Sequence, residues 1–142
     1  MRKHFMTLMA IVCAIFILSL TGCKKDYAEM IIGTWQETES ICTEKVNGEI
    51  TDTYSLFEPG ETFTMTFKKD NTYTAKTVNE HGTFEDMGTW FIEDDKITIT
   101  DIDDVVGMTF NIDQLEKKNL TIVYTEEFDK YVISIEMKMK RI

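Results

Sequence analysis

Apolar and polar residues alternate along most of this chain after its first 30 residues. Between positions 62 and 67, for example, Phe63, Met65 and Phe67 alternate with three threonines. A period of two is typical of a β-strand that buries only one of its faces. The same pattern predicts eight or nine short strands, over residues 32–43, 50–57, 62–67, 72–78, 84–93, 96–100, 106–112, 120–124 and 131–139.

Short turn sequences separate these strands, among them Pro59-Gly60, Asp70-Asn71 and Asp94-Asp95. Strands joined in order by tight turns favour an antiparallel up-and-down sheet. No amphipathic helix of ten residues follows the leader, so nothing would cover the apolar face of an open sheet. Closure into a barrel buries that face and removes the exposed edges. The pattern therefore predicts an all-β fold, a small antiparallel up-and-down β-barrel of eight or nine strands.

The first 22 residues differ from the rest of the chain. Arg2-Lys3 precedes an apolar run from Phe5 to Leu18, a length typical of a signal peptide and short for a membrane span. The run ends in Leu20-Thr21-Gly22-Cys23, which resembles the lipobox of bacterial lipoproteins. That resemblance implies cleavage before Cys23 and acylation of its new N-terminus, for example with palmitate. The alternative is an ordinary signal peptide cut nearby, with Cys23 a spare thiol.

This interpretation divides the chain into three parts. Residues 1–22 are a cleaved lipoprotein signal peptide, residues 23–30 are the lipidated cysteine and a polar tether, and residues 31–142 are the barrel. Stable anchoring needs more than one acyl chain, which bacterial lipoproteins normally carry. We therefore expect a lipid-anchored protein of the bacterial cell envelope. The outer membrane is favoured, with the domain periplasmic or exposed at the cell surface.

Composition narrows the classes of partner. The chain is 43% hydrophobic and 28% charged, as expected for a folded domain. Without Arg2 and Lys3, 13 basic residues face 25 acidic ones, a net charge of −12. Such a surface repels nucleic acid and anionic lipid, so nucleic-acid binding is excluded. A monomer is favoured, although the sequence does not determine the oligomeric state.

Few residues could carry chemistry. Beyond the leader the chain has one histidine, His81, and one cysteine besides Cys23, namely Cys42. No catalytic triad or Cys/His metal site can be assembled from them. The run from Asp101 to Asp104 lacks the glycine and glutamate of a calcium loop, so we expect a solvated acidic turn. The sequence predicts a protein that is not an enzyme and has no metal or cofactor.

Gly33 and Trp35 in the first strand, together with Gly88-Thr89-Trp90 and the stretch from Phe67 to Tyr73, resemble the lipocalin-like domains of bacterial lipoproteins. The resemblance covers residues 31–142 and implies a calycin-type barrel. In calycins the first-strand tryptophan packs at the closed end under a basic residue from the last strand. That implies a structural trio of Gly33, Trp35 and Arg141. The alternative is that Arg141 lies in a frayed C-terminus.

The inferred interior of the barrel supplies the candidate binding residues. Residues this large could fill the barrel, or line an apolar cup for a lipid, sterol-like or aromatic ligand. Two hypotheses stay open: a module that binds a small hydrophobic ligand, and an envelope interaction or inhibitor protein with a filled barrel. The ligand-lining candidates are Phe63, Met65, Phe67, Tyr73, Trp90, Met108, Phe110 and Tyr124.

The first strand contains a conflict of parity. Continuing from Trp35 with period two turns Glu37 and Glu39 into the barrel, where unpaired carboxylates are costly. A β-bulge just after Trp35 would reverse the parity. The bulge predicts that Thr38, Ser40 and Cys42 point inward instead.

Overall fold

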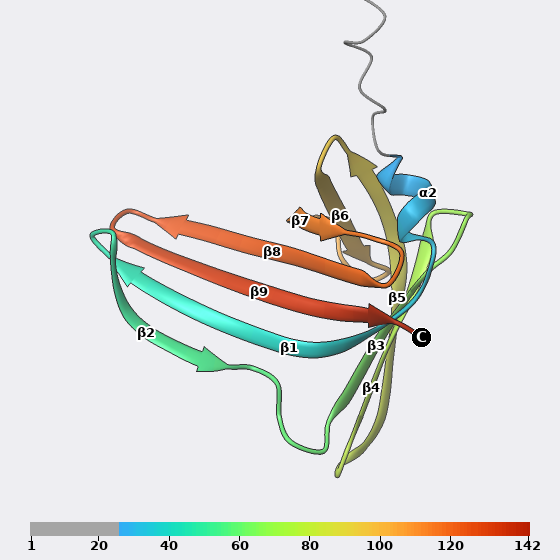
Figure 1. The fold of residues 1–142 in the computed structure, drawn as a ribbon, viewed down its shortest axis with the longest axis horizontal. Helices are drawn as coiled ribbons and strands as arrows, with labels where there is room; N and C mark the ends of the chain where they lie inside the picture. The colour runs from blue at the N-terminus through green and yellow to red at the C-terminus, as the bar shows by residue number, and fades with distance from the viewer. Residues whose placement is uncertain (1–25) are drawn as a thin grey trace, which may run out of the picture.

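The computed structural model describes residues 26–142 (Figure 1). The predicted signal peptide and Cys23 lie outside this range. The described chain contains one five-residue helix, α2 (Tyr27–Ile31), followed by nine strands. The strands are β1 (Gly33–Val46), β2 (Glu49–Ser55), β3 (Thr62–Phe67), β4 (Thr72–Asn79), β5 (Gly82–Glu93), β6 (Lys96–Asp101), β7 (Met108–Leu115), β8 (Asn119–Phe128) and β9 (Tyr131–Arg141).

Eight of these strands form a closed antiparallel barrel. Strands β3 to β9 pair in sequence order, and β9 pairs back onto β1 along nearly its whole length. The other edge of β1 pairs with β3 through residues 33–36 and with β2 through residues 41–46. Strand β2 therefore lies outside the closed ring. The prediction of an all-β up-and-down barrel with eight or nine strands is confirmed.

Several turns have a local cause in the sequence. Asn47, Asn71, Asp94 and Asp129 all have positive φ, between 53° and 63°. Asn and Asp tolerate this left-handed conformation better than other non-glycine residues, because their short polar side chains bond to the nearby backbone. Each of the four lies in a hairpin connection, so the turns help to set the order in which strands pair.

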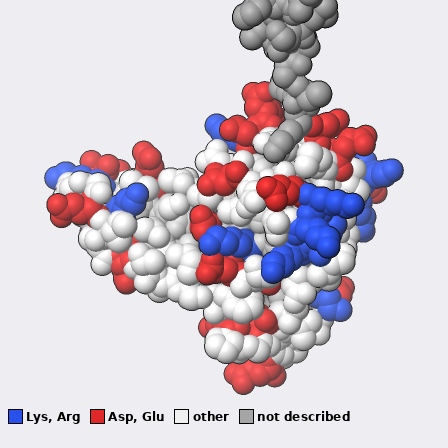
Figure 2. All heavy atoms as spheres, in the orientation of Figure 1, with Lys and Arg blue, Asp and Glu red and all other residues white. Residues whose placement is uncertain are grey.

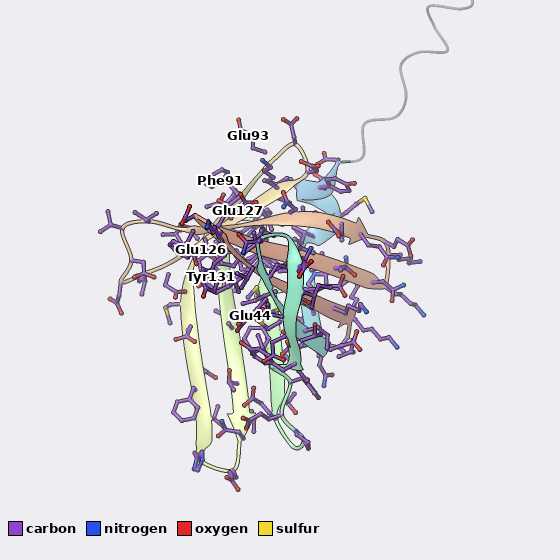
Figure 3. The ribbon with its side chains drawn as sticks, turned by 90° about the vertical axis from the view of Figure 1, so that its left-hand side faces the viewer. Glu44, Phe91, Glu93, Glu126, Glu127 and Tyr131 are labelled. Atoms are coloured by element: carbon purple, nitrogen blue, oxygen red, sulfur yellow. The ribbon has the colours of Figure 1, made fainter. Side chains whose placement is uncertain are left out.

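The two ends of the barrel differ. The turns at 68–71, 94–95 and 116–118 lie at one end with α2, and we call this the closed end. Loops 79–82 and 102–107 lie at the opposite, open end, where the strands diverge. There β1, β2, β8 and β9 extend as an arm away from β3–β5 (Figure 1). Figure 3, with the arm toward the viewer, shows Glu126, Glu127 and Tyr131 gathered on it.

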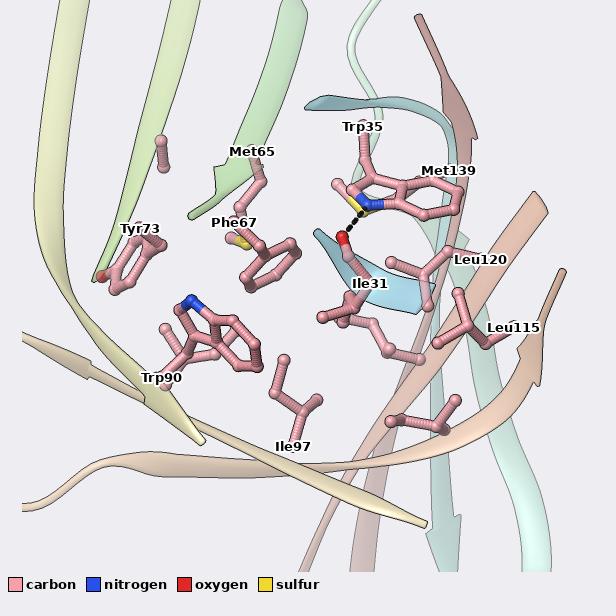
Figure 4. Packing of buried hydrophobic residues seen from close by; sticks show 14 residues of the cluster. Ile31, Trp35, Met65, Phe67, Tyr73, Trp90, Ile97, Leu115, Leu120 and Met139 are labelled. Atoms are coloured by element: carbon pink, nitrogen blue, oxygen red, sulfur yellow. Dashed lines mark hydrogen bonds between the residues drawn. The ribbon is translucent and has the colours of Figure 1, made fainter. Parts of the chain in front are cut away.

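The hydrophobic core fills the closed half of the barrel (Figure 4). Phe67 and Trp90 pack edge to face with ring centroids 5.7 Å apart. Such a pair adds about 0.5–1.5 kcal/mol beyond the burial of its area. The other fully buried large side chains include Trp35, Ile31, Ile97, Leu115, Leu120, Ile122 and Met139.

Helix α2 was not predicted, because the sequence analysis assigned residues 23–30 to a polar tether. Asp26 caps the helix by accepting the backbone N–H of Glu29 at 3.2 Å. Ile31 is fully buried, and its carbonyl oxygen accepts the indole N–H of Trp35 at 2.7 Å. A helix of five residues is too short to show the 3.6-residue period that reveals longer helices. The segment packs onto the barrel from Tyr27 onward.

The β-bulge in β1 exists, but its predicted position was wrong. The register against β9 shifts between Glu37 and Glu39, so Thr38 is the inserted residue. Thr38 is exposed rather than inward, while Glu37 is buried at 8% exposure. Ser40 and Cys42 are buried as predicted.

Because the bulge follows Glu37, only one of the two glutamates enters the barrel. Glu39 turns outward and forms an ion pair with Lys138 of β9. The bulge thus spares Glu39 the free-energy cost of burial. The carboxylate of Glu37 still bears that cost.

Candidate functional site

The closed end is built around Arg141. Its guanidinium carbon lies 4.3 Å from the ring centroid of Trp35. Its Nη1, Nη2 and Nε donate hydrogen bonds to the carbonyl oxygens of Ile32 (2.6 Å), Met30 (2.5 Å) and Lys117 (2.8 Å). One side chain from the last strand thus holds the segment before β1 and the β7–β8 turn. Through these contacts Arg141 forms part of the barrel floor.

Gly33 completes this floor. Its φ is +137°, and a Cβ atom at this position would lie only 2.3 Å from Nη1 of Arg141. The absence of a side chain lets the guanidinium reach the Ile32 carbonyl. The structure therefore brings together the three residues that the resemblance grouped, and Trp35 also packs in the hydrophobic core.

Above the filled half, the barrel contains a cavity of about 230 Å³. Its walls come from six strands and the loop after β6, and most of the lining is apolar. Eight of the lining residues are Phe63, Met65, Tyr73, Ala75, Ile99, Met108, Phe110 and Met137. This cavity is the candidate ligand site, because inward side chains of several strands converge on it.

Five of the eight predicted ligand-lining residues line the cavity, and two of these, Met65 and Tyr73, also belong to the hydrophobic core. Phe63, Met65, Tyr73, Met108 and Phe110 line the cavity. The other three do not line it. Phe67 and Trp90 belong to the filled core, and Tyr124 contacts the Phe110 ring at a centroid distance of 5.7 Å. Contact of any of these residues with a ligand stays a prediction.

Three aspartates that were not predicted from the sequence also line the cavity: Asp86, Asp101 and Asp104. The hydroxyl of Tyr73 donates a hydrogen bond to Asp101. The prediction of a solvated turn for residues 101–104 was therefore incomplete. Asp101 shares the parity of the buried Ile97 and Ile99, and this signal could have identified it.

A second cleft, of about 530 Å³, adjoins the cavity. The two spaces share Tyr73, Asp101 and Asp104 as lining residues. Gly88, also in the cleft lining, lies where β5 meets the end of β6, and a Cβ there would lie 2.0 Å from the carbonyl oxygen of Thr100. A glycine at this position therefore permits the close approach of the two strands beside the cavity.

Among residues 26–142, Glu37 is the one buried carboxylate. Burial raises the pKa of its side chain, a hydrogen bond from Ser40 lowers it in part, and the charge of Glu61 raises it further. Glu37 does not line the cavity, although it faces the interior. Its effect is on stability, since the charged form is disfavoured by desolvation.

Little catalytic chemistry surrounds the cavity. His81 is exposed beside the β4–β5 turn, 3.4 Å from Glu80. Within residues 26–142, no group of three or more His, Cys, Asp and Glu side chains could hold a metal ion. Cys42 is a free, buried thiol. That the protein is not an enzyme stays a prediction.

None of the helices in the described part of the chain has the length and apolar character needed to cross a membrane.

Solved structures identify the class of fold. A lipocalin-like protein from Bacteroides uniformis superposes with a TM-score of 0.52 at 12% identity, covering 80% of this chain and 99% of that one. A protein from Bacteroides eggerthii superposes with a TM-score of 0.53 at 15% identity, covering 79% of this chain and 99% of that one. Lobster apocrustacyanin A1 superposes with a TM-score of 0.51 at 11% identity, covering 80% of this chain and 62% of that one. The chain therefore has a lipocalin-like barrel.

These identities are low, so the likeness concerns the fold alone. No family model matches the sequence, and no curated protein matches it.

Proposed function

We propose that this protein is a membrane-anchored, non-enzymatic lipoprotein that binds a small, mainly apolar ligand in the open half of its barrel. The observation that supports binding most directly is the cavity of about 230 Å³ above the filled closed half. Apolar surface buried there would stabilise a complex by about 25 cal/mol per Å² before the entropic cost of binding is counted.

The volume of the cavity limits the size of the ligands that it can hold. Drug-sized ligands usually occupy pockets of about 300–1,000 Å³. At about 30 Å³ for a water-sized group, 230 Å³ accommodates roughly eight such groups. A ligand with an eight-carbon chain or a single substituted ring fits this space. A sterol or a long-chain lipid would have to extend out of the mouth.

Filling the cavity tests the proposal. Ala75 is buried and lines the cavity, so Ala75→Leu places a larger apolar group in the ligand's space. Ala28→Leu is the matched control, because Ala28 is exposed on α2. We expect calorimetry with octanol to show saturable binding to the wild-type domain and to Ala28→Leu, and at least about tenfold weaker binding to Ala75→Leu. Equal affinities for all three proteins would contradict binding in this cavity.

A protein-interaction role is the second candidate, and the β6–β7 loop favours it. Ile102, Val105 and Val106 are 71%, 98% and 81% exposed beside the mouth of the barrel. Contiguous exposed apolar residues are typical of interaction sites. A photo-crosslinker at Val106, compared with one at the exposed Phe91 of β5, would test this in cells. Recovery of only the monomer from Val106 would argue against a partner.

The anchor is supported by the sequence and by where the described chain begins. Asp26 lies at the closed end beside α2, and three residues from Cys23 span at most roughly 11 Å. Figure 2 shows mainly acidic side chains around the start of the described chain, with a group of basic side chains farther along the same face. An acylated Cys23 would therefore hold the closed end near the membrane, with the mouth away from it.

Substitution of the cysteines tests the anchor in cells. Cys23→Ala should move the protein from the membrane fraction to the soluble fraction, whereas Cys42→Ala should leave it in the membrane fraction. Membrane association of Cys23→Ala equal to that of the wild type would contradict the anchor.

A further inference from the structure

We propose that the barrel cavity selects small amphiphiles with a positively charged head, such as a primary ammonium, over neutral and anionic ones. This inference rests on the proposed ligand binding and adds the chemical class of the ligand. It comes from the charged residues of the cavity lining. Asp86, Asp101 and Asp104 line the cavity, and no lysine, arginine or histidine does.

The carboxylates are confined to one side of the lining. Asp86 comes from β5, Asp101 from β6 and Asp104 from the loop that follows β6. Phe63, Phe110 and Met137 reach the cavity from β3, β7 and β9. The cavity is thus acidic along adjoining segments and apolar on the walls from the other strands. A ligand with one charged head and one apolar body matches this division.

None of the three carboxylates forms an ion pair with a lysine or arginine of residues 26–142. Asp101 has the Tyr73 hydroxyl as a neutral donor. All three residues are exposed, so water solvates them while the cavity is empty. A ligand that displaces this water without supplying a donor would lose affinity, whereas an ammonium head would replace it with charge-assisted hydrogen bonds.

The negative charges of these three aspartates also disfavour anionic ligands. An ionised carboxylate placed among three aspartates is repelled, and a surface as acidic as this one adds to the effect. Lys68 is the one basic residue of the adjoining cleft, and it comes from the β3–β4 turn at the closed end. The cavity that holds the apolar body has no such counter-charge.

Three ligands with the same eight-carbon chain separate the effect of charge from that of apolar burial: octylammonium, octanol and octanoate. Calorimetry with the soluble domain (residues 24–142) at neutral pH and low salt should show octylammonium binding at least about tenfold more tightly than octanol, with octanoate the weakest. Asp101→Asn combined with Asp86→Asn should reduce the preference for octylammonium over octanol by about tenfold.

Asp103→Asn is the matched control. It removes one charge from the loop that follows β6, two residues beyond Asp101, so it is compared with Asp101→Asn alone, and Asp103 does not line the cavity. The preference should therefore survive in this variant. An equal loss in Asp103→Asn would mean that overall charge, and not the cavity wall, attracts the amine, and it would overturn the inference.

The remaining outcomes separate the two proposals. If octanol or octanoate binds as tightly as octylammonium, the inference on charge is wrong and ligand binding stands. If none of the three binds saturably, the inference falls together with the proposed function. Circular dichroism of each variant confirms that the barrel is intact.

Discussion

The closed and open halves of this barrel are built from the same strands and differ in what their inward side chains do. In β3, Phe67 packs into the core at 1% exposure, whereas Phe63, four residues earlier, lines the cavity. Both belong to the same face of the same strand. Inward parity therefore does not by itself identify a ligand-binding residue; the distance from the closed end, where strands converge, decides whether a side chain fills space or borders it.

The halves also differ in charge. The closed end contains a cation, Arg141, whose three nitrogens are all satisfied by backbone carbonyls. The open half contains three carboxylates with no basic partner among the described residues. A charge that is satisfied within the protein stabilises the fold, whereas charges left to solvent are available to a ligand.

The largest expected difference between the halves comes from truncating the two phenylalanines. Phe67→Ala removes a core ring and its contact with Trp90, and we expect a loss of about 3–5 kcal/mol in the free energy of unfolding. Phe63→Ala enlarges an existing cavity, and we expect a loss of less than about 2 kcal/mol. Urea denaturation measures both. Equal losses would mean that the open half is packed as tightly as the closed half.

The next effect concerns the closed end. Arg141→Met leaves the carbonyls of Met30, Ile32 and Lys117 without their donor and removes the cation–π contact, at a cost of about 2–4 kcal/mol. Lys140→Met, at the exposed neighbouring position, should change stability by less than about 0.5 kcal/mol. Thermal unfolding compares the two variants. Similar small changes in both would support a frayed terminus over a structural arginine.

The smallest expected change in the free energy of unfolding comes from substituting Glu37, which lies between the halves. Its pKa is raised in the folded state, so the folded protein binds more protons than the unfolded one and loses stability as the pH rises through the unfolded pKa, about 4.3. Glu37→Gln should therefore stabilise the protein at pH 7, with the gain disappearing as the pH falls toward 4.

Glu39→Gln is the control for this pH dependence. It removes the half-exposed ion pair with Lys138, so it should be neutral or slightly destabilising at pH 7. Urea midpoints measured at both pH values test the contrast. A Glu37→Gln variant that is less stable than the wild type at pH 7 would show that the buried carboxylate is needed in its charged form.

The sequence predicted the regular part of the fold well because alternation reports directly on strands. The predicted strand over residues 62–67 is β3, and the turn at Asp94-Asp95 joins β5 to β6. The position of the bulge could not be predicted from alternation in the sequence. Either location turns some polar residues inward, and only the register against β9 decides which glutamate is buried.

The candidate site was less predictable than the fold. Alternation identified Phe63 and Phe110 as inward, but it could not separate them from Trp90, because cavity and core share one parity. Asp101 was interpreted as part of an acidic turn, since three of the four residues at 101–104 are acidic. Its bond to Tyr73 depends on two strands that are far apart in the sequence.

The most direct test of the central claim is a chemical-shift map of the ¹⁵N-labelled domain titrated with octylammonium. The account predicts saturable shifts at Phe63, Ala75 and Phe110 in the open half, and unchanged signals at Phe67 and Trp90 in the closed half. Shifts centred on Phe67 and Trp90, or shifts that never saturate, would contradict a ligand site in the open half of the barrel.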